Sequence, residues 1–377
     1  MMNIKKLIII FCLLSVIVGC KPVSSETKLS VNKKIEDCID VIRQKYNLPA
    51  VAGAIITSDG LWGVGVVGVR KKDTDIKVTV NDLWHLGSET KAMTASLAGV
   101  IVQEGLIDWD TTISEMFPEL SGMMPETHRN ITLKQFLAHR TGLTSNLDWA
   151  AISRSGTIAQ QRQEVLKQFC SQKLDFQPDT NTQYSNMGYV LASIMLEKAT
   201  NSSWEKLIAK HIFRPLKMKS AGFGGTGTVG EIDQPWPHFA NGRPTPTNGL
   251  NRDNPLVMAP AGCVHCSIED WGKFVADHLK GSRGNKALLQ KETYQILHHK
   301  FSDSRFALGW VVYQRDWAKG NVLTHRGTNN MNFAETWLSP NQNFAVLVCI
   351  NQGGDNIKEV SDQACAALIE LYLKNIK

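Results

Sequence analysis

The chain has 377 residues, of which 43% are hydrophobic and 20% are charged, and its formal net charge is +6. This length and composition suit a globular protein with a sizeable core, built as one large domain or two smaller ones. Its lysines and arginines are scattered rather than gathered in stripes with aromatic residues, which argues against a nucleic-acid-binding protein.

The N-terminal segment does not have the pattern of a folded domain. Two lysines precede an apolar run at residues 7–18, which is shorter than the roughly 20 residues of a membrane span and is typical of a secretory signal. The run ends at Ile17-Val18-Gly19-Cys20, which resembles a bacterial lipobox. We expect residues 1–19 to form a signal peptide, Cys20 to carry a lipid, and residues 20–31 to be a tether.

This N-terminus predicts an exported protein of the cell envelope. With Cys20 lipidated, the protein would be a membrane lipoprotein facing the periplasm, and without the lipid it would be secreted. Removal of residues 1–19 takes away two lysines and no acidic residue, so the formal charge falls from +6 to +4.

The remaining chain, residues 32–377, has sheet-like ends and a helical middle. A helix is predicted at 32–46, and apolar runs at 51–56 and 62–69 flank a Ser58-Asp59-Gly60 turn, as in a hairpin. Residues 88–215 have mainly helical patterns, and 221–260 are rich in Gly, Pro and Asn. Beyond them we expect helices at 267–279, 291–298 and 357–373, and strands at 306–313, 321–324, 332–338 and 344–350.

This order of elements predicts an α/β (α+β) fold. Helices would cover a sheet formed by residues 32–87 and 256–377, and an all-helical lobe, about 88–255, would be inserted between the two halves of the sheet. We expect the functional site in the cleft between the lobes, where ligand pockets are common.

Ser88 stands at the start of a predicted buried helix, residues 88–104, with Lys91 three positions later. The spacing places both side chains on one helix face. A lysine in a first helical turn is electrostatically unfavourable, because the free N–H groups there carry partial positive charge. A catalytic role explains it, since that field and desolvation lower a lysine pKa toward that of a usable base.

Ser-x-x-Lys alone is a loose pattern, and an N-cap serine with a solvated lysine explains most of its occurrences. It also occurs at Ser25–Lys28, Ser30–Lys33 and Ser203–Lys206. Two further features favour Ser88. Tyr184-Ser185-Asn186 is the one Tyr-x-Asn sequence in the chain and precedes an apolar, helix-like run, and His325-Arg326-Gly327 lies between strand-like runs.

These three elements, in this order, resemble the serine β-lactamase and penicillin-binding-protein superfamily, especially its class C-like esterase and D-peptidase branch. The resemblance covers the chain from about residue 33 to the C-terminus. Further landmarks in family order are Trp84-His85-Leu86-Gly87, Phe136 to Leu143, Phe176-Gln177-Pro178 and Ala259-Pro260-Ala261-Gly262.

The resemblance implies an antiparallel sheet flanked by helices and an acyl-enzyme mechanism. Ser88 would be the nucleophile, Lys91 its base and Tyr184 the residue that passes the proton to the leaving group. Asn186 and His325 would orient the substrate, and the turn at Gly327 and Thr328 would place the Thr328 N–H beside that of Ser88 to hold the oxyanion.

One departure from the family pattern concerns His325, because true β-lactamases and transpeptidases usually have lysine there. A largely neutral imidazole pairs poorly with the carboxylate of a β-lactam or a peptide C-terminus at pH 7. Arg326 does not replace it, since alternation along a strand points its side chain to the opposite face. We therefore favour esters or amides, including D-amino-acid peptides, over β-lactams as substrates.

Six cysteines remain after Cys12 and Cys20 are set aside, and export would place them in an oxidising compartment. Their pairing cannot be read from the sequence. In the family the first and last helices pack on one sheet face, which implies a Cys38–Cys365 disulfide as one pairing. Cys263-Val264-His265-Cys266 lacks the second ligand pair of a zinc site, so we expect no metal and a structural role.

We expect no cofactor, a small-molecule or peptide substrate, a membrane contact through the lipid, and a monomer. The rival hypothesis is a lipid-anchored penicillin-binding or sensor protein of the same fold that acylates slowly or not at all. The presence of every expected catalytic side chain argues against that rival.

Overall fold

The computed structural model describes residues 32–154, 156–249, 252–301 and 303–376. The predicted signal peptide, the lipidated Cys20 and the tether lie outside these residues. Within the described ranges, no helix has both the length and the apolar character needed to cross a membrane.

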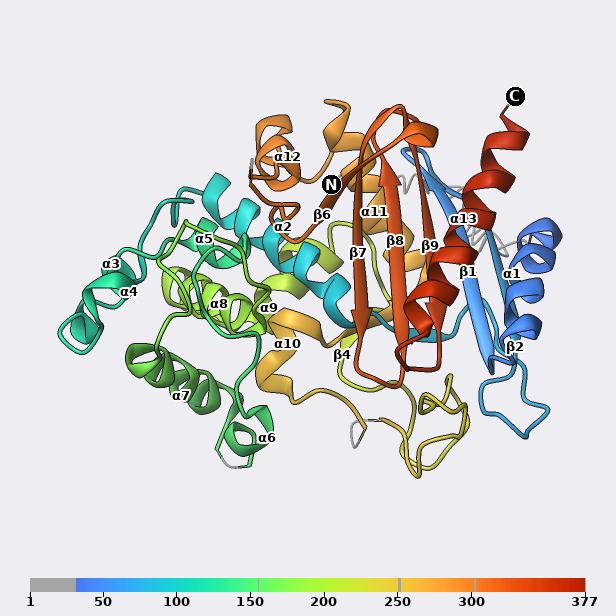
Figure 1. Cartoon of the computed structure of the whole chain (residues 1–377), viewed down its shortest axis with the longest axis horizontal. Coiled ribbons are helices and arrows are strands. Elements are labelled where there is room, and N and C mark those ends of the chain that lie inside the picture. Colours follow the sequence, from blue (N-terminus) through green and yellow to red (C-terminus); the bar gives the residue numbers. More distant parts are fainter. Residues whose placement is uncertain (1–31, 155, 250–251, 302, 377) are drawn as a thin grey trace, which may run out of the picture.

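A large antiparallel sheet forms the right-hand part of the molecule in Figure 1. The N-terminal hairpin pairs directly with the last strand, so the two ends of the chain build one sheet, as the sequence predicts. Across the sheet its strands are β2 (Gly60–Gly68), β1 (Ala50–Thr57), β9 (Phe344–Ile350), β8 (Phe333–Ser339), β7 (Gly320–Thr328) and β6 (Val311–Arg315).

Helices cover both faces of this sheet. α1 (Lys33–Lys45) and α13 (Ile357–Asn375) pack on one face, and α11 (Ile268–Ser282) packs on the other (Figure 1). The sequence of β1 shows why both faces are covered, because Val51 and Ile55 join the core beneath α1 and α13, while Ala54 and Ile56 join the core on the α11 side. A strand buried on both faces reads as a continuous apolar run.

A second part of the molecule is mainly helical and lies beside the free edge of the sheet (Figure 1). Its central helix, α2 (Thr90–Gln103), is apolar nearly all round and almost wholly buried, as expected for a helix packed on every side. The other helices are α3 (Ile113–Met116), α4 (Glu126–Arg129), α5 (Leu133–Leu137), α6 (Trp149–Ile152), α7 (Ile158–Ser171), α8 (Asn186–Thr200), α9 (Trp204–Ile208), α10 (Ala259–Gly262) and α12 (Lys291–His298).

Short elements join the two parts. A small sheet has the strand order β3 (Leu83–His85), β5 (Val264–Ser267) and β4 (Gly222–Phe223), and β3 leads straight into the 3₁₀ turn η1 (Gly87–Glu89) before α2. The other short helical turns are η2 (Pro118–Leu120), η3 (Ala209–Phe213), η5 (Leu256–Met258) and η6 (Asp316–Ala318).

Three boundaries differ from the sequence prediction. The strand expected at 321–324 continues to Thr328, so His325, Arg326 and Gly327 lie within β7 instead of between strands. Ser88 lies in η1 rather than in the first turn of the α-helix, which starts at Thr90. The strand expected from Phe306 starts only at Val311, because Gly309 turns the chain at φ +79° against α2. A Cβ on Gly309 would lie 2.6 Å from Ala92 Cα, so this approach requires glycine. As a result Phe306 lies near Tyr184 instead of in the sheet, with ring centroids 6.1 Å apart.

Candidate active site

Ser88 and Lys91 lie together at the junction of η1 and α2. Lys91 Nζ is 3.1 Å from Ser88 Oγ, within hydrogen-bond distance. Lys91 is fully buried, while Ser88 is partly exposed. The serine therefore faces solvent or substrate, and the amine behind it is shielded from water.

The other contacts of Lys91 hold its amine between two carbonyl oxygens. Its Nζ also lies 2.7 Å from Asn186 Oδ1 and 2.6 Å from the carbonyl oxygen of Ala261. A neutral amine has two N–H donors and one lone pair, so donation to these two oxygens leaves the lone pair for the Ser88 hydroxyl. Burial lowers the pKa of Lys91 well below that of an ordinary lysine.

Tyr184 contacts the same serine oxygen from the loop that leads into α8. Its hydroxyl lies 2.7 Å from Ser88 Oγ, and it stands just before α8, whose N-cap is Ser185. Burial raises the pKa of Tyr184, so the phenol keeps its proton and donates. With Lys91 neutral, the three groups form one chain in which Tyr184 donates to Ser88 and Ser88 donates to Lys91.

His139 supports Tyr184, a role that the sequence did not reveal. Its ring lies 4.5 Å from the Tyr184 ring, centroid to centroid, and its Nδ1 accepts a hydrogen bond of 3.1 Å from Ser185 N. His139 adopts a left-handed backbone conformation at φ +60° and is buried. Burial keeps the pKa of His139 well below its usual value, so it acts as a neutral ring that holds the tyrosine in place.

Asn186 is the first residue of α8, and its side chain forms part of the site. Its Oδ1 accepts from Lys91, and its Nδ2 donates to Asn146 Oδ1 at 2.7 Å. These two contacts fix which way the amide faces. Asn146 is a second residue that the sequence did not single out, since it lies in a loop without a motif.

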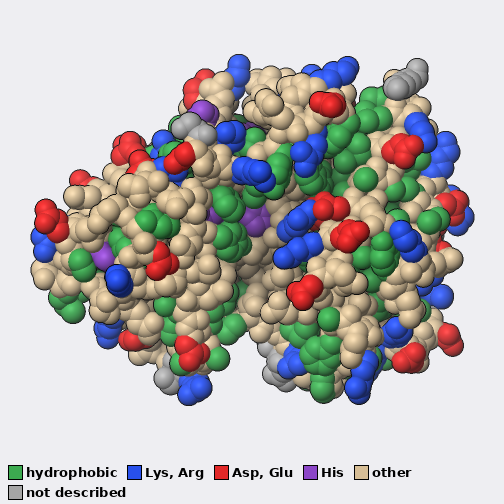
Figure 2. Space-filling view, viewed as in Figure 1, with side chains coloured by type: hydrophobic (Ala, Val, Ile, Leu, Met, Phe, Trp, Pro, Cys, Tyr) green, Lys and Arg blue, Asp and Glu red, His purple; other side chains and the backbone are tan. Residues whose placement is uncertain are grey.

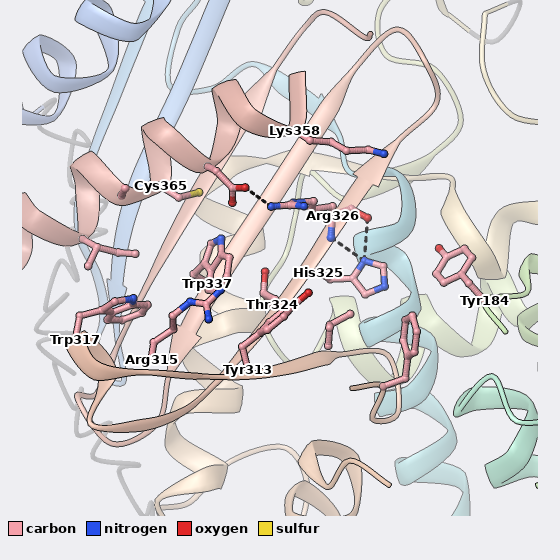
Figure 3. Close-up of a pocket in the computed structure, with 15 residues that line it drawn as sticks. Tyr184, Tyr313, Arg315, Trp317, Thr324, His325, Arg326, Trp337, Lys358 and Cys365 are labelled. Atoms are coloured by element: carbon pink, nitrogen blue, oxygen red, sulfur yellow. Dashed lines mark hydrogen bonds and ion pairs between the residues drawn. The ribbon is translucent and has the colours of Figure 1, made fainter. Parts of the chain in front are cut away.

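His325 faces Tyr184 across the pocket drawn in Figure 3, with ring centroids 6.3 Å apart. Burial and the nearby Lys91 lower the pKa of His325 to about 3, which makes it neutral at pH 7. Arg326 points to the opposite face of the sheet, where Nε lies 2.8 Å from Glu335 Oε1 and the guanidinium also pairs with Asp362 of α13. In the described structure the position usually occupied by a family lysine therefore carries no charge.

Two glycines bring the backbone N–H groups of Ser88 and Thr328 together. Gly87 has φ +51°, and a Cβ there would lie 2.2 Å from Thr328 N. A Cβ on Gly327 would lie 1.8 Å from Leu86 O and 2.7 Å from Ser88 N. Any side chain at either position would push β7 away from η1, so both glycines are needed for this approach.

A buried hydrogen-bond cluster behind the serine turn was not found from the sequence. His85 Nε2 lies 2.8 Å from Asp253 Oδ1, both side chains are 2% exposed, and Asn329 Nδ2 donates to the same oxygen at 2.9 Å. His85 Nδ1 accepts from Gly87 N at 3.1 Å, which leaves the ring proton on Nε2, the nitrogen that faces the carboxylate. The cluster ties the turn that carries Ser88 to the loop that follows Thr328.

The cysteine predictions have mixed outcomes. Cys38 and Cys365 are free thiols in the structure, so the expected disulfide is not formed, although α1 and α13 pack together. The two thiols face different surroundings, because Glu370 lies near Cys38 whereas Cys365 lies by Glu335 and Asp362. Cys266 lies in β5 and Cys263 directly precedes that strand, and both thiols are buried and free. Within the described ranges, no three His, Cys, Asp or Glu side chains are grouped as metal ligands.

The site opens into a hollow between the two parts of the molecule. Figure 2 shows this hollow with histidine side chains inside it and lysine and arginine side chains on the rim formed by the sheet part. The associated pocket has a volume of about 660 Å³ and includes Tyr184 and His325 in its lining. This volume suits a small-molecule or short-peptide ligand.

Solved structures with the same fold include penicillin-binding-protein relatives. The octameric penicillin-binding protein homologue from Pyrococcus abyssi matches with a TM-score of 0.72 and 19% identity, over 90% of this chain and 77% of that chain. D-alanine carboxypeptidase AmpC from Burkholderia cenocepacia matches with a TM-score of 0.70 and 17% identity, over 89% of this chain and 97% of that chain. The β-lactamase/transpeptidase-like fold expected from the sequence is confirmed, and the expected monomer stays a prediction.

Sequence relatives are distant but span most of the chain. Protein flp from Staphylococcus aureus is 22% identical over 333 residues, which are 87% of this chain and 64% of that protein. The unguisins hydrolase ungD' from Aspergillus campestris is 24% identical over 350 residues, 87% of this chain and 63% of that protein. The chain thus spans somewhat less than two thirds of the length of these relatives. The sequence model of the family described as Beta-lactamase matches residues 35–369, so this chain belongs to the Beta-lactamase family.

Proposed function

We propose that this protein is a serine hydrolase that cleaves esters or amides, including D-amino-acid peptides, through an acyl-enzyme. One observation carries the proposal most directly. Ser88 Oγ lies within hydrogen-bond distance of both the buried Lys91 amine, at 3.1 Å, and the Tyr184 phenol, at 2.7 Å. A nucleophile between a base and a proton donor is the arrangement that covalent acyl transfer needs.

Acylation begins when Lys91 takes the Ser88 hydroxyl proton and the serine oxygen bonds to the substrate carbonyl carbon. The carbonyl oxygen becomes an anion, which the N–H groups of Ser88 and Thr328 stabilise. The bond to the leaving group then breaks, and Tyr184 gives the leaving group its proton. The proton held by Lys91 replaces the one that Tyr184 gave, so the site returns to its starting protonation.

Deacylation repeats these steps with water as the nucleophile. Tyr184 takes a proton from the water as it passes its own proton to Lys91, the water oxygen attacks the acyl carbon, and Ser88 leaves with the proton that Lys91 returns. His325 has no charge to offer a substrate carboxylate at this position. This favours neutral groups beside the scissile bond and argues against β-lactams as the main substrates.

The relatives support a hydrolase in general but do not specify its substrate. The relative from Aspergillus campestris is named a hydrolase of unguisins, and a structural neighbour is named a D-alanine carboxypeptidase. We take from these names only the reaction class, hydrolysis of an amide or ester.

The test is hydrolysis of a short p-nitrophenyl ester by the purified protein, with fluorophosphonate labelling of the active serine. We expect activity and labelling to be lost in Ser88→Ala, and activity to be lost in Lys91→Met. The matched control is Lys206→Met, because Ser203 and Lys206 have the same spacing on α9 but Lys206 is exposed. Full activity in Ser88→Ala would reject the mechanism.

The same experiment separates the enzyme from the sensor hypothesis. Mass spectrometry after incubation with nitrocefin or a fluorophosphonate reads the mass of the Ser88 adduct over time. Turnover of the ester supports the hydrolase, whereas an adduct on Ser88 that persists without turnover of any ester or D-Ala-D-Ala peptide supports a sensor.

We also propose that the protein is an exported lipoprotein of the cell envelope, on the basis of the Ile17-Val18-Gly19-Cys20 sequence alone. Metabolic labelling with a fatty-acid analogue in a bacterial host should mark the wild type and leave Cys20→Ser unlabelled. Labelling of both forms, or of neither, would contradict it.

A further inference from the structure

The pocket that begins at Tyr184 and His325 extends far beyond the reacting groups. Figure 3 shows these two residues at one end and Trp317 at the other, with β6 along one side and α13 along the other. The pocket runs over Thr324, Tyr313 and Trp337. We call this part of it the β6–α13 groove. It is continuous with the active site, so a substrate held at Ser88 can reach into it.

The groove exists because α13 covers only part of its sheet face. α13 packs against β8, β9 and β1, which leaves the outer strands β7 and β6 beside the helix without a helical cover. Alternation along the strands places Tyr313 of β6 and Trp337 of β8 on this face. Their rings lie 5.9 Å apart at an interplanar angle of 33°, forming a flat aromatic floor.

Cations without ion-pair partners surround this floor. The Arg315 guanidinium lies 4.9 Å from the Tyr313 ring centroid and 5.3 Å from that of Trp337, and Arg305 lies 5.1 Å from the Tyr313 ring. Among the described residues, no ion pair joins Arg315, Arg305 or Lys358 to an acid.

The acids at the groove are already paired. Asp362 lies in the lining and pairs with Arg326, and Glu335 is fully buried beneath it, with hydrogen bonds from Arg326 Nε and from Trp337 Nε1 at 2.9 Å. The charge that faces a ligand is therefore that of Arg315 and Lys358. A flat apolar group placed against the aromatic rings gains apolar contact, and an anion attached to it gains electrostatic attraction from these cations.

We propose that the β6–α13 groove binds the leaving-group part of the substrate, and that this part contains an aromatic or other flat apolar group followed by a carboxylate or similar anion. The inference rests on the proposed hydrolase function. The leaving group is assigned to the groove because the groove starts at Tyr184, which hands the leaving group its proton. His325, beside the scissile bond, is neutral, whereas the cations without ion-pair partners lie farther along the groove. We therefore expect the anion of the substrate to lie away from the reacting carbonyl.

Aryl acetates test this assignment directly. All acetate esters give the same acetyl-enzyme, so a leaving-group effect appears in acylation and hence in kcat/KM. The matched substrates are two acetate esters, one of 4-hydroxyphenylacetic acid and one of its neutral primary amide, 4-hydroxyphenylacetamide. A methylene separates the carboxylate of one and the amide of the other from the ring, so the two phenols have similar reactivity.

We expect the wild type to favour the anionic ester, and added salt to reduce this preference by screening. Arg315→Gln and Lys358→Gln should each lower the ratio of kcat/KM for the anionic ester to kcat/KM for the neutral ester by about two- to fivefold, as expected for an exposed charge pair. The value for the neutral ester should change little. Lys319→Gln is the control, because Lys319 is an exposed cation in the turn between β6 and β7 that does not line the groove.

The outcomes separate this inference from the proposed function. Equal kcat/KM values for the two esters, an unchanged ratio in both groove variants, or an equal fall in Lys319→Gln would overturn the groove assignment while leaving the hydrolase intact. If no ester is cleaved and no fluorophosphonate labels Ser88, both proposals fail. If labelling occurs without turnover, 4-hydroxyphenylacetate should protect Ser88 better than 4-hydroxyphenylacetamide, and equal protection would reject the groove site.

Discussion

Lys91 Nζ lies 3.1 Å from Ser88 Oγ, and two carbonyl oxygens, those of Asn186 and Ala261, occupy its other hydrogen-bond positions. Because burial lowers its pKa, the lysine can be a base at a pH where an exposed lysine is protonated. The protonated form has no lone pair for the serine proton. The pH dependence of the reaction therefore reports directly on this amine.

We expect kcat/KM for the neutral aryl acetate to rise with pH through the Lys91 pKa and then to level off. The rise should have its midpoint below the ordinary lysine value of about 10.4, and Lys91→Arg should be inactive since a guanidinium stays protonated. The measurement is a pH–rate profile of kcat/KM. A midpoint at or above the ordinary lysine value would contradict a buried neutral amine.

Tyr184→Phe should retain the fold and lose most of the activity. The variant keeps the ring that packs on His139, with centroids 4.5 Å apart, but removes the proton donor to Ser88. Loss of a general acid typically lowers the rate by about 10²–10⁴-fold. Steady-state kinetics give the loss, and thermal unfolding tests the fold. A Tyr184→Phe protein with near-normal kcat would remove tyrosine from the mechanism.

Gly327→Ala should disrupt the oxyanion site, because the new Cβ would lie 1.8 Å from Leu86 O and 2.7 Å from Ser88 N. Loss of one oxyanion donor costs about 10²–10³-fold in kcat, and we expect at least this effect. Gly122→Ala is the matched control, since nothing lies within 4 Å of a Cβ built there. Equal activities of the two alanine variants would show that the approach of β7 to η1 is not needed.

Asp253→Ala should weaken both stability and catalysis, although Asp253 does not touch the reacting atoms. The change removes the hydrogen-bond acceptor of the buried Asn329 Nδ2 and the carboxylate that faces His85 Nε2. An unsatisfied buried polar group costs about 1–3 kcal/mol. Chemical denaturation measures the stability, and kcat is compared with that of Asp253→Asn, which retains an acceptor oxygen. We expect Asp253→Asn to recover most of both, and equal losses in the two variants would refute an acceptor role.

The sequence anticipated those parts of the site that depend on local chain geometry. Ser88 and Lys91 are three residues apart, so a helical turn alone brings them to one face. The position of Tyr184 just before a helix was also predictable, because polar residues precede it and an apolar run follows. Strand alternation correctly assigned Arg326 to the face opposite His325.

The parts that were missed depend on contacts between distant segments. His139 lies in the Phe136–Leu143 landmark but had no predicted role, and Asn146 and Asp253 have no local pattern that marks them. Each acts through a partner from another part of the chain. The Cys38–Cys365 disulfide was expected because the two helices pack together. That reasoning did not give the direction of the two thiols, which the turns of each helix decide.

By itself, the sequence indicated the family, the order of strands and helices, and the residues proposed to carry the chemistry, because these follow from motifs, periodicity, spacing and residue type. Only the tertiary structure decided that Tyr184 reaches Ser88, that Lys91 is enclosed by carbonyl oxygens, and that a cation-lined groove opens beside α13. These features depend on burial and on the distances between segments far apart in the chain, which set pKa values and cavities and leave no trace in local sequence.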